Sequence, residues 1–219
     1  MSDTTYQYNS ISPSCMESIA KICNTTQENI LLSNTHNHQA SLTLSEANES
    51  NIVKAVEKAY QNLTPATIDI QTVNTAYGIS RSNNYTMDPN RPYDNRMTVI
   101  RFDNAETGDP IGLVYSVPMH NTMFGNASAS RSKHNLLNCE FTGYASRALE
   151  KQFGSKNKPF VAMYINGFYG NTGPYAQGKY YADSLEKLEK FGEEFAKEIA
   201  GAFQSIKTFA VTGDLKLPS

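Results

Sequence analysis

Two apolar runs of strand length, separated by a short polar segment, constrain the fold of this chain most strongly. Residues 97–102 (MTVIRF) and 111–117 (IGLVYSV) flank the segment DNAETGDP. Asp, Asn, Gly and Pro are the residues that tight connections use, because they tolerate or preset turn conformations. The sequence therefore predicts a β-hairpin at about residues 97–117.

Segments with helical and with strand periodicity alternate along the rest of the chain. Apolar residues recur at helical spacing in four segments, 15–23, 44–63, 143–153 and 184–203. Short apolar or alternating runs of strand length occupy residues 29–33, 66–80 and 160–165. An alternating order of strands and helices predicts an α/β fold with a mixed, largely parallel sheet covered by helices.

The length and composition limit the organisation and the partners of the chain. A chain of 219 residues can bury one well-packed core, so we expect a flexible N-terminus at 1–14 and a single α/β domain at 15–219. The formal net charge is −2, and no basic run could neutralise a row of phosphates, which argues against a nucleic-acid partner. The sequence predicts no oligomeric state.

Neither a membrane span nor an export signal is evident in the sequence. No apolar stretch approaches the roughly 20 residues that a transmembrane helix needs. The N-terminal segment lacks the basic and apolar regions of a signal peptide, so we expect a soluble chain without an assigned compartment. Cys15, Cys23 and Cys139 form no CxxC pair, which makes a disulfide framework or a cysteine-based zinc site improbable.

Three histidines and an arginine follow predicted strands directly. His36 and His38 lie in the polar segment NTHNHQ after the run 29–33, and His120 follows the second strand of the hairpin. Arg81 follows the run 66–80. Strand ends are where α/β proteins place their sites, and neutral imidazole is the commonest side-chain ligand of zinc. An isolated H-x-H motif is more often incidental than functional, but His120 strengthens the hypothesis of a metal site.

Five segments of the chain form a pattern that extends over about residues 28–203. They are ENILLSNTHNHQAS, YGISRSNNY, NRMTVIRFDNAETGDPIGLVYSVPMHNTM, NLLNCEFTGYASRALEK and FVAMYINGFYGNTGPY. Together they resemble the neutral (non-lysosomal) ceramidases and their shorter bacterial relatives. This resemblance implies that His36 and His120 bind a catalytic Zn²⁺. It also implies that His38 and Arg81 contact the attacking water or the developing oxyanion, where an imidazole can move a proton and a guanidinium can stabilise negative charge.

The sequence departs from the family pattern at three places. Gly173 stands where the family has a serine, with Thr172 beside it, and Glu140-Phe141 replaces an Asp-Asn pair. The family completes its zinc shell with a Glu and a Tyr from beyond the matched region, so we expect this chain to be part of such a domain. Glu140, Tyr169 and Tyr175 are open alternatives as further ligands.

The resemblance predicts a zinc-dependent hydrolase that cleaves the N-acyl amide bond of ceramide-like lipids with a metal-activated water. The partner would be a small amphiphilic lipid, which leaves peripheral membrane contact open. One alternative is a catalytically silent relative or fragment that serves binding or assembly. Another is a zinc hydrolase that acts on a different amide or ester.

Overall fold

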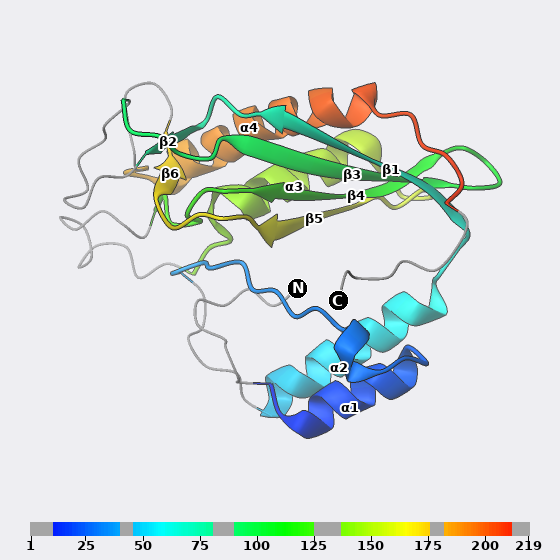
Figure 1. The fold of residues 1–219 in the computed structure, drawn as a ribbon. Coiled ribbons are helices and arrows are strands. Elements are labelled where there is room, and N and C mark those ends of the chain that lie inside the picture. Colours follow the sequence, from blue (N-terminus) through cyan, green and yellow to red (C-terminus); the bar gives the residue numbers. More distant parts are fainter. Residues whose placement is uncertain (1–10, 40–45, 81–89, 125–136, 176–181, 212–219) are drawn as a thin grey trace.

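The computed structural model describes residues 11–39, 46–80, 90–124, 137–175 and 182–211 of the chain. Figure 1 shows the elements, which in chain order are α1 Pro13–Ile22, the short 3₁₀ helix Gln27–Asn29, α2 Glu46–Gln61, β1 Ala66–Asn74, β2 Gly78–Ser80, β3 Arg96–Asn104, β4 Pro110–Val117, α3 Glu140–Phe153, β5 Val161–Asn166, β6 Thr172–Pro174 and α4 Leu185–Ser205.

The main sheet has the strand order β1-β3-β4-β5. β1 pairs with β3 and β3 with β4 in antiparallel fashion, whereas β4 and β5 are parallel. The α/β class, the mixed sheet and the hairpin of β3 and β4 are thus confirmed, but the pairing is mainly antiparallel and not largely parallel as expected. The reason is the connections: among the described elements of the main sheet, only β4 and β5 are joined by a crossover helix, α3, and a parallel pair requires such a crossover.

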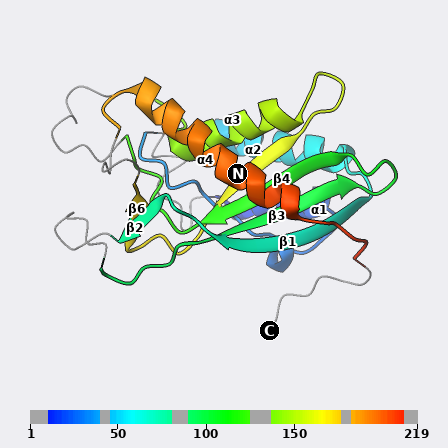
Figure 2. The same cartoon turned by 90° about the horizontal axis from the view of Figure 1, so that it is seen from above.

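Helices α3 and α4 cover one face of this sheet (Figures 1 and 2). Alternate residues of β3 and β4, including Val99 and Tyr115, are fully buried against aromatic side chains of the helices such as Phe195. The two helices approach closely at Gly192, where a Cβ atom would lie 2.5 Å from the Cβ of Tyr144. The period-two and helical patterns of the sequence therefore place one apolar core between the sheet and this helix pair.

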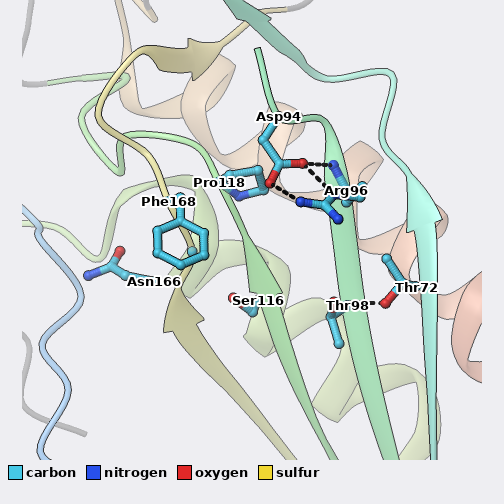
Figure 3. A pocket seen from close by; sticks show the side chains of 9 residues that line it. Thr72, Asp94, Arg96, Thr98, Ser116, Pro118, Asn166 and Phe168 are labelled. Carbon is cyan, nitrogen blue, oxygen red and sulfur yellow. Dashed lines mark hydrogen bonds and ion pairs between the residues drawn. The ribbon is translucent and has the colours of Figure 1, made fainter.

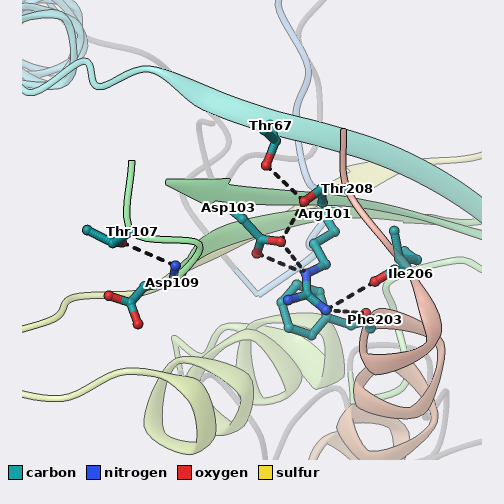
Figure 4. Close-up of polar contacts among 8 residues, drawn as sticks. All are labelled: Thr67, Arg101, Asp103, Thr107, Asp109, Phe203, Ile206 and Thr208. Carbon is teal, nitrogen blue, oxygen red and sulfur yellow. Dashed lines mark hydrogen bonds and ion pairs between the residues drawn. The ribbon is translucent and has the colours of Figure 1, made fainter. Parts of the chain in front are cut away.

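A polar cluster joins the C-terminal end of α4 to the sheet (Figure 4). Arg101 of β3 lies 2.9 Å from Asp103 through its Nε atom and donates from Nη1 to the carbonyls of Phe203 and Ile206 at 3.3 and 3.2 Å. Thr208 donates to the same Asp103 carboxylate at 2.7 Å. The guanidinium therefore satisfies carbonyls that the end of a helix leaves without intrahelical partners.

Helices α1 and α2 lie on the opposite side of the sheet from α3 and α4 (Figures 1 and 2). Helix α1 begins at Pro13, inside the segment expected to be flexible, and Ser12 caps it by accepting from the Cys15 N–H. Ser12 also donates to the Glu49 carboxylate of α2 from its backbone N–H at 2.7 Å and from its hydroxyl at 2.5 Å. These contacts tie the two helices together at the start of α1.

The run 30–33 is not the buried strand that its composition predicts. It lies outside the helices and strands, and Leu31 is 82% exposed. A run of three apolar residues cannot distinguish a paired strand from a segment that lines an apolar surface, and here the second arrangement occurs. The predicted helices at 15–23, 44–63, 143–153 and 184–203 are confirmed within a few residues. Among the described helices, none is both long and apolar enough to cross a bilayer.

Candidate functional site

The parallel pairing of β4 and β5 brings two loops together at one edge of the sheet. β4 ends at Val117 and leads to His120, and β5 ends at Asn166 and leads to Tyr169. The carboxyl ends of parallel strands lie at the same edge, so these side chains meet. The rings of His120 and Tyr169 are 4.8 Å apart between centroids and nearly perpendicular.

The segment that carries His36 is attached to the same edge by hydrogen bonds from distant residues. The amide of Asn166 donates to the Asn34 carbonyl at 2.6 Å, and the amide of Asn121 donates to the Thr35 carbonyl at 3.0 Å. His36 itself has a φ of 52°, in the left-handed region, and its N–H donates to the Asn34 side chain at 3.1 Å. This local turn places the imidazole beside the loops that follow β4 and β5.

Three histidines converge at this edge. The Nε2 atoms of His36 and His38 are 3.2 Å apart, and the ring centroids of His36 and His120 are 5.3 Å apart. Two nitrogens on one tetrahedral zinc, at about 2.0–2.1 Å each, would be about 3.3 Å apart. The Nε2 atoms of His36 and His38 have about this separation, and the ring of His120 lies beside that of His36.

Hydrogen bonds hold the ring orientations of His36 and His120. The Nδ1 atom of His120 lies 3.2 Å from the Thr172 carbonyl of β6, and a carbonyl can only accept, so Nδ1 carries the proton. In the neutral imidazole, Nε2 then keeps the lone pair that a metal needs. The Nδ1 atom of His36 lies 3.3 Å from the hydroxyl of Tyr169, whose ring is 4.6 Å from the His36 ring.

The open alternatives for further ligands have different surroundings. Tyr169 packs against both His36 and His120. Glu140 is fully buried, and its two carboxylate oxygens accept the backbone N–H groups of Met123 and Phe124 at 2.9 Å each. Within the described parts of the chain, no group of three or more His, Cys, Asp or Glu side chains is arranged to hold a metal ion. Of the three candidates, Tyr169 is the one that the structure places against the histidines. The sequence around Tyr169 gives no reason to prefer it over Glu140 or Tyr175.

The remaining two positions that the sequence singled out are Arg81 and Gly173. Arg81 lies outside the described residues, directly after the end of β2. Gly173, at the family's serine position, lies in the β2–β6 ladder opposite Ile79, and the adjacent Thr172 is buried with its hydroxyl donating to the Asn171 side chain at 3.2 Å. No hydroxyl therefore stands at position 173, and that of Thr172 already has a protein partner.

A polar hollow opens beside this edge on the face of the sheet away from α3 and α4 (Figure 3). Arg96 donates to Asp94 through Nε and Nη2 at 2.9 and 3.0 Å, and these bonds lower the pKa of the Asp94 carboxyl. Asn166 and the ring of Phe168, which is 86% exposed, border the other side. The Arg96–Asp94 pair and the exposed Phe168 ring therefore border the same hollow.

Comparison with known proteins finds a matching family model and similar solved structures, among them two ceramidases. The family model described as "Neutral/alkaline non-lysosomal ceramidase, N-terminal" matches residues 1–192. The structure of neutral ceramidase from Pseudomonas aeruginosa is similar, with a TM-score of 0.63 and 20% identity, over 87% of this chain and 35% of that one. A ceramidase complexed with C2 gives a TM-score of 0.64 and 21% identity, over 87% and 34%.

No curated protein gives a significant match to the sequence. At 20–21% identity the two solved structures show the fold alone. The chain spans about a third of the length of each of them.

Proposed function

This chain belongs to the neutral/alkaline non-lysosomal ceramidase family, and on that premise we propose that it is a zinc-dependent hydrolase that cleaves the N-acyl amide bond of ceramide-like lipids. The observation that carries the proposal is the convergence of His36, His38 and His120 at the end of the parallel strand pair. They come from two segments more than 80 positions apart in the sequence. The Nε2 atoms of His36 and His38 are 3.2 Å apart, a separation that two ligands of one cation have, and the ring of His120 lies 5.3 Å from that of His36 between centroids.

We assign the metal to the Nε2 atoms of His36 and His120. Zinc bound there would lower the pKa of a water molecule toward 7 and polarise the amide carbonyl. The carbonyl of Thr172 keeps the His120 proton on Nδ1 and fixes the ring, which favours binding through Nε2. The Tyr169 hydroxyl at the Nδ1 of His36 would play the same orienting part.

His38 and Arg81 are the proposed catalytic residues. His38 is exposed, and its Nε2 lies 3.2 Å from that of His36, so its imidazole could accept a proton from the attacking water and return it to the leaving amine. Arg81, which follows β2, would supply positive charge where the carbonyl oxygen becomes an oxyanion. Since Gly173 replaces the family's serine, this proposal assigns no step to a hydroxyl at that position.

Metal analysis of the purified chain tests the proposal directly. The wild type should bind about one equivalent of zinc, and the double variant His36→Ala/His120→Ala should bind almost none. His134→Ala is the matched control and should keep the metal, because His134 is the one histidine of the four that is not assigned to the site. Stoichiometric zinc in the double variant would remove the assignment.

A second function, binding or assembly without catalysis, has two observations in its favour. Gly173 lacks the hydroxyl of the family, and the described residues contain no complete set of three metal donors of the His, Cys, Asp or Glu type. Fatty-acid release from ceramide, measured with and without detergent on the zinc-loaded wild type, separates the two. Zinc binding without release from ceramide would favour the silent role or another amide or ester substrate.

A further inference from the structure

An apolar groove separates the helix pair α1–α2 from the outer face of β5. It encloses about 490 Å³, and its walls include Ile52 and Val56 from α2 and Met163 and Ile165 from β5. Among the described residues that line it, Ser33 and Asn51 are polar and none is charged. A cavity of this size and lining is typical of sites for small apolar ligands.

Several apolar side chains that line the groove are exposed to water. Leu31 and Leu32 are 82% and 39% exposed, and Met163 is 36% exposed. Neighbouring exposed apolar residues of this kind mark a surface that a ligand or partner covers, because their contact with water is unfavourable.

One end of the groove leads to the histidine cluster. Ser33 lines the groove, and His36 follows three residues later, at most about 10 Å along an extended chain. On the other wall Ile165 lines the groove, and the next residue, Asn166, donates to the Asn34 carbonyl at 2.6 Å. The apolar walls thus end at the segment that carries the proposed metal ligands.

We propose that this groove holds the fatty acyl chain of the amide substrate, with the carbonyl end at His36. The inference rests on the proposed function and adds the subsite that selects acyl length. An unbranched hydrocarbon chain suits the groove because it needs no polar partner. A peptide segment would have to leave buried backbone N–H and C=O groups without partners, since the described residues that line the groove offer two polar side chains.

Fatty-acid binding can be measured by fluorescence without any turnover. The chain contains no tryptophan, so an introduced tryptophan is the sole indole and reports on its own surroundings. Leu31→Trp places one indole in the groove. Leu63→Trp, at an exposed leucine that does not line it, is the matched control; Leu63 is 70% exposed and Leu31 82%. Brominated palmitic acid should quench the fluorescence of Leu31→Trp saturably and leave Leu63→Trp nearly unchanged. Equal quenching of both, or of neither, would overturn the proposal.

A charge in the groove should weaken this binding selectively. In the Leu31→Trp background, Ile52→Glu should raise the apparent dissociation constant for brominated palmitic acid about tenfold or more, because the chain would meet a carboxylate. Val53→Glu, one position away on α2 and outside the lining, should change it less than twofold. A similar effect of both would contradict a site in this groove.

Chain-length dependence then links the groove to the reaction. Ile52→Glu should lower the kcat/KM for a long-chain ceramide about tenfold relative to that for an acetyl-chain analogue, and Val53→Glu should leave the ratio unchanged. An unchanged ratio in Ile52→Glu would overturn the acyl subsite while leaving the hydrolase intact. Absence of turnover with every chain length would instead refute the hydrolase, and the quenching experiment would still decide whether the groove binds fatty acids.

Discussion

Replacing Glu140 by alanine should destabilise the protein more than the loss of any exposed carboxylate. Its side chain is fully buried, and each carboxylate oxygen accepts one backbone N–H, from Met123 and from Phe124, at 2.9 Å. A hydrogen bond to a charged group contributes about 1.5–3 kcal/mol, and a buried N–H left without a partner incurs a desolvation cost. The two bonds together predict a loss of about 3–6 kcal/mol in the free energy of unfolding.

The matched variants separate the hydrogen bonds from general side-chain loss. Glu140→Gln keeps one acceptor oxygen and should lose about half as much as Glu140→Ala. Glu193→Ala, at an exposed position of α4, should change the free energy by less than about 0.5 kcal/mol. Urea denaturation followed by circular dichroism gives these values, and with a slope of about 3 kcal/mol/M the midpoint of Glu140→Ala should fall by about 1–2 M.

The outcome also bears on the histidine site, because Met123 and Phe124 follow His120 closely in the chain. If Glu140→Ala unfolds at the same urea concentration as Glu193→Ala, the carboxylate does not hold these N–H groups, and the structural role assigned to it is wrong. If instead it is destabilised as expected, zinc affinity should also fall, because the loop after β4 loses its anchor.

Three further predictions concern the framework. Arg101→Ala should lower the free energy of unfolding by about 3 kcal/mol in urea, because it leaves the nearly buried Asp103 carboxylate without its cation; a change below about 0.5 kcal/mol would contradict this. Hydrogen bonds from Ser12 lower the pKa of Glu49 below 4.5, so this contact stabilises the fold above pH 4.5 and is lost as the pH falls through the lowered value. Ser12→Ala should return the Glu49 pKa toward 4.5 in a carboxyl NMR titration, and an unchanged pKa would exclude the contact. Gly192→Ala should lower Tm by at least about 4 °C in a thermal melt, because a methyl group there would overlap α3; an unchanged Tm would mean that the helices pack less closely.

Much of the fold could be predicted from local patterns. The strands at 97–102 and 111–117 carry alternating apolar residues around a turn-rich segment, and β3 and β4 form the predicted hairpin. The helical spacing at 184–203 likewise predicts α4 nearly to its bounds. Such patterns are readable because a strand repeats every two residues and a helix every 3.6, whatever the rest of the chain does.

The run 30–33 and the strand directions could not be predicted in the same way. Three consecutive apolar residues fit a buried strand as well as a groove lining, and only the position of α1 and α2 beneath β5 separates these outcomes. Strand direction depends on which strands become neighbours, and the antiparallel pairing of β1 with β3 is a contact between segments that no local period relates.

For the candidate site, the sequence by itself determined that imidazoles follow two apolar runs, at His36 and at His120, and that the family motif surrounds them. The tertiary structure alone decided that these rings meet, and that Tyr169, not Glu140, packs against them. The physical reason is that long-range hydrogen bonds, such as that from Asn166 to the carbonyl of residue 34, bring together segments 132 positions apart. Local propensity cannot encode such a contact, because it exists only once both segments have packed onto the same sheet.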